Sequence, residues 1–136
     1  MDINKTYELP FPVSQVYSAW ISNDFAVAPV TSIEIEPKVG GVFRLTTVSG
    51  QNIGKMEGKI LQIDHNRCIR YTWHWGGPDT PSVVDARFSE NDGRTFINLS
   101  HSGLESAESV KGHESGWDRY IDGLTQQLHD RSGNQE

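Results

Sequence analysis

One stretch near the C-terminus constrains the fold more than any other. At about 100° per residue, one side of a helix over residues 109–128 collects most of its large apolar groups. The residues on that side are Val110, His113, Glu114, Trp117, Tyr120, Ile121, Leu124 and Leu128. Gly112, Gly116 and Gly123 each cost this helix about 1 kcal/mol relative to alanine. Burial of each large apolar side chain returns about 1.5–3 kcal/mol, so the helix needs a partner surface to form. The glycines share a flank on which another surface can approach closely.

The partner surface is predicted from residues 30–102, where the apolar period changes to two. Alternation and turn chemistry indicate about six strands, with side chains such as Phe43, Tyr71 and Ile97 facing inward. A strand over 2–9 precedes them, and the pattern then predicts two short helices. These are expected at 12–21 and at 23–28, the second one capped by Asn23 or Asp24. The prediction is therefore an α+β fold, a curved antiparallel sheet of about six to seven strands around the long C-terminal helix.

Further details of the strands are also predicted. The strand over 53–63 contains Gly54 and Gly58, which indicate a bend or bulge. The clearest alternation runs over 69–75, and the turn sequence 76–81 ends it. Glu90–Gly93 is a strong hairpin signal. The length predicts one domain over 1–130, with a polar tail over 131–136 that frays.

Charge and cysteine content exclude several classes of function. Eighteen acidic and twelve basic residues give a net charge of −6, which disfavours nucleic acid and anionic membranes as partners. Cys68 is the single cysteine, which excludes an intramolecular disulfide, and parity places it on the outer face as an inert thiol. The histidines show no ligand spacing, so neither a metal nor another cofactor is predicted. No targeting signal or apolar run of about 20 residues is seen, which predicts a cytoplasmic protein.

Five motifs carry a family resemblance. They are E-P-K-V-G-G-V-F (36–43), G-K-I-L-Q-I-D (58–64), I-R-Y-T-W (69–73), L-S-H-S-G-L (99–104) and G-W-D-R-Y-I-D-G-L (116–124). Their order resembles proteins related to the activator of Hsp90 ATPase, over residues 5 to 128. These belong to the START-like, helix-grip superfamily, together with the birch-pollen allergen, polyketide cyclases and a protein that captures an enediyne antibiotic. The sequence departs from the family at Lys38, which follows Pro37 where an arginine is usual.

The resemblance implies a cavity between sheet and long helix that holds an apolar or aromatic small molecule. Its matching positions are Phe43, Tyr71, Trp73, His101 and Trp117. The full set of candidate ligand-binding residues is Trp20, Phe25, Phe43, Tyr71, Trp73, Trp75, His101, Trp117 and Tyr120. Trp20 and Phe25 are expected at the entrance beneath the short helices, and Trp75 at the rim. For Trp73 and Trp117, core packing and cavity lining both stay open.

His101 is the titratable group of greatest interest, because parity places its ring inside. One interpretation is a core histidine satisfied by a backbone carbonyl or a hydroxyl group. The other is a ligand donor or a general base. His113 and Glu114 are interpreted as capping and solvated polar groups at the helix start, with a catalytic His–Glu pair as the alternative. No catalytic residue is assigned.

The sequence favours a non-enzymatic protein that binds an apolar or aromatic small molecule. One alternative is a chaperone-associated interaction module, by analogy with the co-chaperone. A second is a cyclase- or hydrolase-like enzyme with His101 as base. A homodimer formed through a sheet edge or rim aromatics also stays open.

Overall fold

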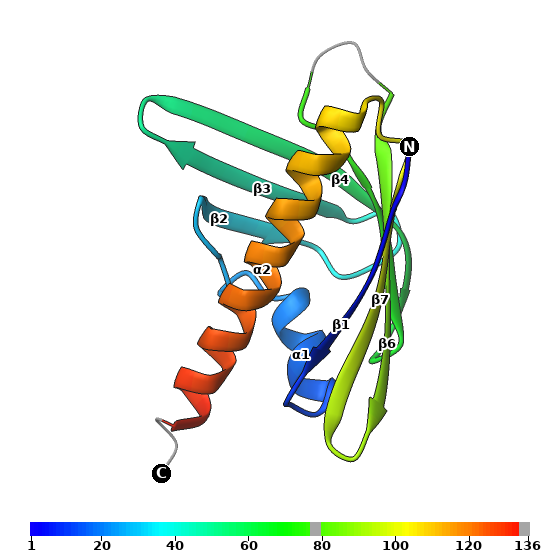
Figure 1. Cartoon of the computed structure of the whole chain (residues 1–136), viewed down its shortest axis with the longest axis vertical. Coiled ribbons are helices and arrows are strands. Elements are labelled where there is room, and N and C mark those ends of the chain that lie inside the picture. Colours follow the sequence, from blue (N-terminus) through cyan, green and yellow to red (C-terminus); the bar gives the residue numbers. More distant parts are fainter. Residues whose placement is uncertain (77–79, 134–136) are drawn as a thin grey trace.

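A curved antiparallel sheet faces one long helix in the computed structural model, which describes residues 1–76 and 80–133 (Figure 1). The elements found in these residues are β1 (Ile3–Leu9), α1 (Val13–Trp20), β2 (Val30–Ile35), β3 (Val42–Ser49), β4 (Asn52–Asp64), β5 (Cys68–Trp73), β6 (Ser82–Asn91), β7 (Arg94–Ser102) and α2 (Ala107–Gly133). The strands form one sheet in the order β1-β7-β6-β5-β4-β3-β2, with every neighbouring pair antiparallel. The predicted fold class is confirmed.

Short turns set the register of the sheet. In the β6–β7 hairpin Asn91 pairs with Arg94, and the two residues between them, Asp92 and Gly93, have φ values of 55° and 75°. Positive φ at both central residues gives the two-residue turn whose twist matches that of the flanking strands. The hairpin predicted from Glu90–Gly93 is therefore confirmed. β1 pairs with β7 and so brings the start of the chain beside the last strand.

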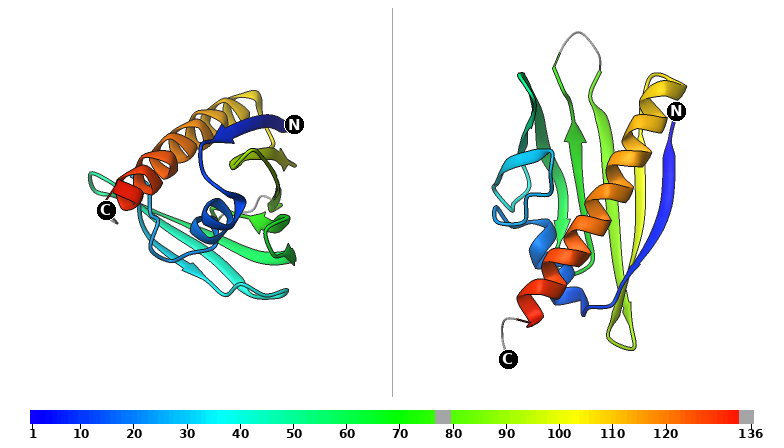
Figure 2. Two further views of the ribbon diagram at one scale, coloured as in Figure 1. Left: turned by 90° about the horizontal axis from the view of Figure 1, so that it is seen from below. Right: turned by 60° about the vertical axis from the view of Figure 1, so that its left-hand side comes forward.

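The two halves of α2 have different surroundings. Ile121, Leu124 and Leu128 of the second half are buried in the core. Helix α1 lies in the space between this half of α2 and the sheet, where Val16 and Trp20 are buried (Figure 2). No such filling helix underlies the first half of α2 among the described residues. The fold is therefore packed at one end and leaves room at the other.

The second predicted short helix is absent. Residues 23–28 form turns and irregular backbone, so the described chain has one short helix after β1 rather than two. Pro29 disfavours helical geometry in the residue before it. The Oδ1 atom of Asn23, which was expected to cap a helix, instead accepts the backbone N–H of Ile35 at 2.9 Å. This bond ties the segment to the start of the sheet.

Several boundaries differ from the sequence predictions. Helix α2 continues to Gly133, into the tail that was expected to fray. β5 ends at Trp73 rather than residue 75, and the irregularity of β4 lies between Ile60 and Gln62 rather than at its glycines.

Cys68 is buried, with 6% exposure, although parity placed it outside. This burial raises the pKa of its thiol. The predictions made for Gly77, Pro78 and Asp79 and for the last three residues lie outside the described residues.

Candidate ligand-binding site

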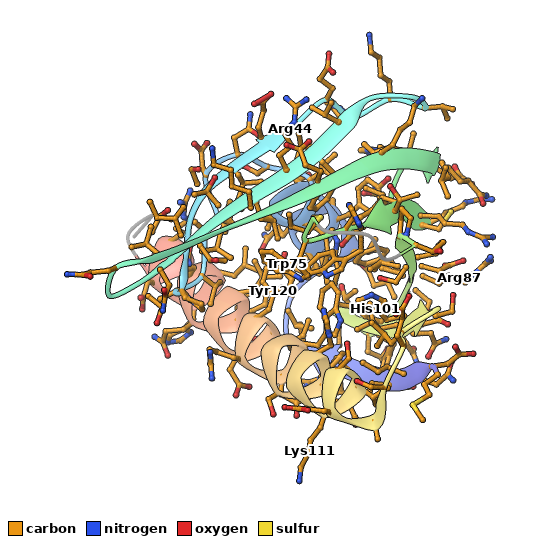
Figure 3. The ribbon with its side chains drawn as sticks, turned by 90° about the horizontal axis from the view of Figure 1, so that it is seen from above. Arg44, Trp75, Arg87, His101, Lys111 and Tyr120 are labelled. Atoms are coloured by element: carbon orange, nitrogen blue, oxygen red, sulfur yellow. The ribbon has the colours of Figure 1, made fainter. Side chains whose placement is uncertain are left out.

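A pocket of about 360 Å³ lies between the first half of α2 and the sheet. Strands β2, β3 and β5 supply the lining of one wall, α2 supplies the other, and residues 27–29 lie at the side. The lining residues are Trp20, Val27, Ala28, Pro29, Val30, Ile33, Phe43, Leu45, Thr47, Tyr71, Trp73, Trp75, Ser109, Gly112, His113, Gly116, Trp117, Arg119 and Tyr120. Figure 3 shows Trp75 and Tyr120 projecting into the space between helix and sheet. Known ligand pockets start at about 300 Å³, so this one suits a small ligand.

Aromatic rings dominate the lining. All four tryptophans of the chain border the pocket. The rings of Trp20 and Trp117 stack at a centroid distance of 5.9 Å and an angle of 13°. Phe43 and Tyr71 stack at 4.1 Å and 5°. These pairs fix flat apolar surfaces on both walls, which are suited to contact with another aromatic ring.

The glycines of α2 separate into two groups. A Cβ atom at Gly112 or Gly116 would meet nothing within 4 Å, and both residues line the pocket. A Cβ atom at Gly123 would lie 2.4 Å from Val27 Cγ1. The close approach predicted for the glycine flank is therefore made by Gly123. Gly112 and Gly116 instead leave open space, and together they cost the helix about 2 kcal/mol relative to alanine.

His101 is fully buried and lies at the centre of a hydrogen-bond chain. The indole Nε1–H of Trp117 donates to His101 Nδ1 at 3.1 Å, so this nitrogen carries no proton. The other ring nitrogen, Nε2, therefore donates to Ser82 Oγ at 2.8 Å. Ser82 in turn donates to the carbonyl oxygen of Trp73 at 3.1 Å. The ring is a neutral Nε2–H tautomer with both nitrogens engaged inside the protein.

His113 accepts a hydrogen bond from Trp73, as His101 does from Trp117. Its Nδ1–H donates to the carbonyl oxygen of Ser109 at 2.8 Å, and its Nε2 accepts the indole N–H of Trp73 at 3.2 Å. The His101 and His113 rings meet edge to face at 5.0 Å. Burial, followed by the proximity of the His113 ring, lowers the pKa of His101 to about 4. The indole N–H groups of Trp73 and Trp117 are thus already used, and neither is free to orient a ligand.

The structure brings most of the predicted site residues together. The residues that line the pocket as predicted are Trp20, Phe43, Tyr71, Trp73, Trp75, Trp117 and Tyr120. Two others do not border it. His101 lies behind the tryptophans, and Phe25 stacks against the guanidinium of Arg131 at 4.0 Å. Trp75 is 41% exposed, as expected at a rim. Ligand binding by any of these residues stays a prediction.

Sequence reasoning missed part of the lining. Residues 27–29 form a side of the pocket, and no periodicity marks them because they belong to the loop before β2. His113 had been interpreted as a solvated capping group, although it lies one turn before Trp117 on the apolar side of the helix. The spacing of His113 from Trp117 is the sequence signal from which its place in the pocket lining could have been predicted. The open positions Gly112 and Gly116 had been interpreted as points of close backbone approach.

A sequence model of the Activator of Hsp90 ATPase homolog 1-like protein family matches residues 10–129. The chain belongs to this family. Because a match of this extent covers the sheet and the long helix together, the resemblance seen in the five motifs is confirmed. No match was found among curated proteins.

Solved structures share the fold at low sequence identity. Protein MLL2253 from Mesorhizobium loti has a TM-score of 0.81 and 18% identity, over 96% of this chain and 98% of that chain. The AHSA1 protein from Silicibacter pomeroyi has a TM-score of 0.77 and 17% identity, over 96% and 99%. CalU16 from Micromonospora echinospora has a TM-score of 0.72 and 22% identity, over 92% and 74%. At these identities the structures establish the helix-grip fold of this family member and leave its ligand open.

Two further observations limit the chemistry of the described chain. Within residues 1–76 and 80–133, no three or more histidine, cysteine or acidic side chains gather closely enough to hold a metal ion. Neither helix in this part of the protein combines the length and the apolar composition needed to cross a bilayer.

Proposed function

We propose that this protein binds an apolar, aromatic small molecule in the pocket between α2 and strands β2, β3 and β5. The proposal rests on one observation, which is the open space lined by aromatic side chains beside helix α2. Gly112 and Gly116 weaken α2 and gain no packing contact in return. Larger residues at these positions would fill the pocket and stabilise the helix. Keeping the space open makes physical sense if a ligand occupies it.

Membership of the family fits a ligand-binding domain. An enzyme with His101 as general base is not favoured by the geometry, because both ring nitrogens are engaged and the residue does not border the pocket. The chaperone-associated role, the homodimer and the cytoplasmic location stay predictions. Sequestration of a ligand from water is therefore the function that the geometry supports best.

Fluorene, a flat tricyclic hydrocarbon, is a suitable first probe. Since every tryptophan of the chain borders the pocket, binding is expected to change the intrinsic fluorescence and to raise the melting temperature. A probe at a hundred times its dissociation constant stabilises the fold by about 2.7 kcal/mol. Unchanged fluorescence and an unchanged melting temperature at saturating fluorene would contradict the proposal.

Gly116→Leu is expected to weaken fluorene binding at least tenfold, because the new side chain occupies the pocket. The same change should leave folding intact or improve it, since leucine is about 0.8 kcal/mol better than glycine in a helix and a Cβ atom at this position meets open space. Ser115→Leu places the same side chain at an exposed position of α2 outside the pocket lining and serves as the matched control. Fluorescence titrations give the dissociation constants. Equal affinity of wild type and Gly116→Leu would place the probe elsewhere.

A further inference from the structure

Two tyrosines from different elements line the pocket. Tyr71 comes from β5, has 1% exposure and lies flat on Phe43. Tyr120 comes from α2 and packs edge-on against Trp20, at a centroid distance of 5.0 Å and an angle of 90°. Both rings are therefore held in place by aromatic neighbours. Their hydroxyl groups are polar ends on a mostly apolar lining, whose other polar side chains are those of Thr47, Ser109, His113 and Arg119.

The hydrogen bonds of the four tyrosines divide them into two pairs. Outside the pocket, the hydroxyl of Tyr17 donates to the carbonyl oxygen of Cys68 at 3.0 Å, and that of Tyr7 donates to Asp118 at 2.7 Å. In the described part of the chain, no acceptor is found for the hydroxyl hydrogen of Tyr71 or of Tyr120. Among the described residues, the fully buried side-chain atoms without a partner belong to Asn66 and His74, so the two tyrosine hydroxyl groups keep access to open space. The two pocket tyrosines therefore offer donors that the protein itself does not use.

The environment keeps both phenols protonated. Burial raises the pKa of Tyr71, and it raises that of Tyr120 further together with the charge that an ionised Tyr71 would carry. Each phenol thus presents a neutral hydrogen-bond donor to the pocket.

A neutral oxygen acceptor is the group that complements these donors best. A carboxylate beside the two neutral phenols would give up hydration at a cost that they offset poorly. Arg119, the cation of the lining, is exposed to solvent. A carbonyl oxygen has two lone pairs and a much smaller desolvation cost. The flat stacked walls select an aromatic frame for the group that bears it.

We propose, on the basis of the binding function proposed above, that the ligand is an aromatic carbonyl compound whose oxygen accepts hydrogen bonds from the hydroxyl groups of Tyr71 and Tyr120. The two tyrosines are then specificity-determining residues. The aromatic walls supply affinity for the ring system, and the hydroxyl pair distinguishes a ketone from the hydrocarbon of the same shape. Neither His101 nor an indole N–H of Trp73 or Trp117 takes part.

Fluorenone and fluorene form a matched pair of probes, because they share the tricyclic frame and differ in a carbonyl group. Wild-type protein is expected to bind fluorenone about tenfold more tightly, which corresponds to about 1.4 kcal/mol and to one or two net neutral hydrogen bonds. In the double variant Tyr71→Phe/Tyr120→Phe the ratio of the two dissociation constants should fall to about one. Each single variant should give an intermediate ratio.

Tyr17→Phe is the control, since it removes a buried tyrosine hydroxyl that lies outside the pocket. It should keep the tenfold ratio. Fluorene binding by the double variant reports that the pocket is still folded. Equal affinity of wild type for both probes would overturn the carbonyl assignment and leave the proposed function standing. A ratio that survives in the double variant would overturn the role of the tyrosines. Failure of both probes to bind wild type would overturn the binding function itself.

Discussion

Replacing His101 by alanine is expected to lower the free energy of unfolding by about 3–5 kcal/mol. The ring is fully buried, and its removal leaves a cavity. It also leaves the indole N–H of Trp117 and the hydroxyl of Ser82 without their present partners. A small domain has about 5–15 kcal/mol of stability in total. The histidine of the L-S-H-S-G motif is thus a structural link between β7, β6 and α2.

Urea denaturation followed by circular dichroism at low temperature measures this loss. His129→Ala removes an exposed histidine from α2 and should change the stability by less than about 0.5 kcal/mol. His101→Gln keeps an acceptor for Trp117 and a donor for Ser82, so it should recover part of the loss. A loss below about 1 kcal/mol in His101→Ala would contradict the hydrogen-bond chain from Trp117 through His101 to Ser82.

The local geometry of the sheet was predictable from the sequence. Period two places Thr95, Ile97, Leu99 and His101 on one face, and all four side chains are buried. Alternation depends only on neighbouring residues, so it survives without knowledge of the tertiary structure. The apolar stripe of α2 was predictable for the same reason. Its partner surface followed because an antiparallel sheet with one apolar face must cover that face.

The fine structure of the site depends on long-range contacts and was not predictable in this way. Parity placed His101 inside the fold. It did not reveal that the two ring nitrogens form hydrogen bonds with Ser82 and Trp117, which lie 19 and 16 residues away in the sequence. Similarly, the last turns of α2 are polar and carry no burial signal. There Arg131 reaches back to Phe25 in the loop that follows α1, a contact that no local pattern encodes.

Acidification from pH 7 to about pH 4 is expected to remove about 3 kcal/mol of stability through His101 alone. Burial, with a smaller contribution from the neighbouring His113 ring, holds the pKa of His101 at about 4 in the folded protein, against 6.5 for an ordinary histidine. The neutral folded ring needs its unprotonated Nδ1 to accept from Trp117. Between these two pKa values the unfolded chain binds a proton that the folded protein does not. Each pH unit of this interval is worth about 1.36 kcal/mol, so stability falls as the pH is lowered.

The pH window separates this effect from that of the carboxylates. Above pH 6.5 His101 is neutral in both the folded and the unfolded state, and its contribution to the free energy of unfolding is fully present. It decreases as the pH falls through 6.5 and is lost at about pH 4. Hydrogen bonds from Lys5 and Tyr7 lower the pKa of Asp118, so that carboxylate begins to lose its stabilising effect only near and below its ordinary value of 3.8. Urea midpoints measured from pH 7 to 4.5 should therefore decline in wild type and much less in His101→Gln. Equal slopes for the two proteins would show that His101 is protonated in the folded state, and the direction of the Trp117 hydrogen bond would then be wrong.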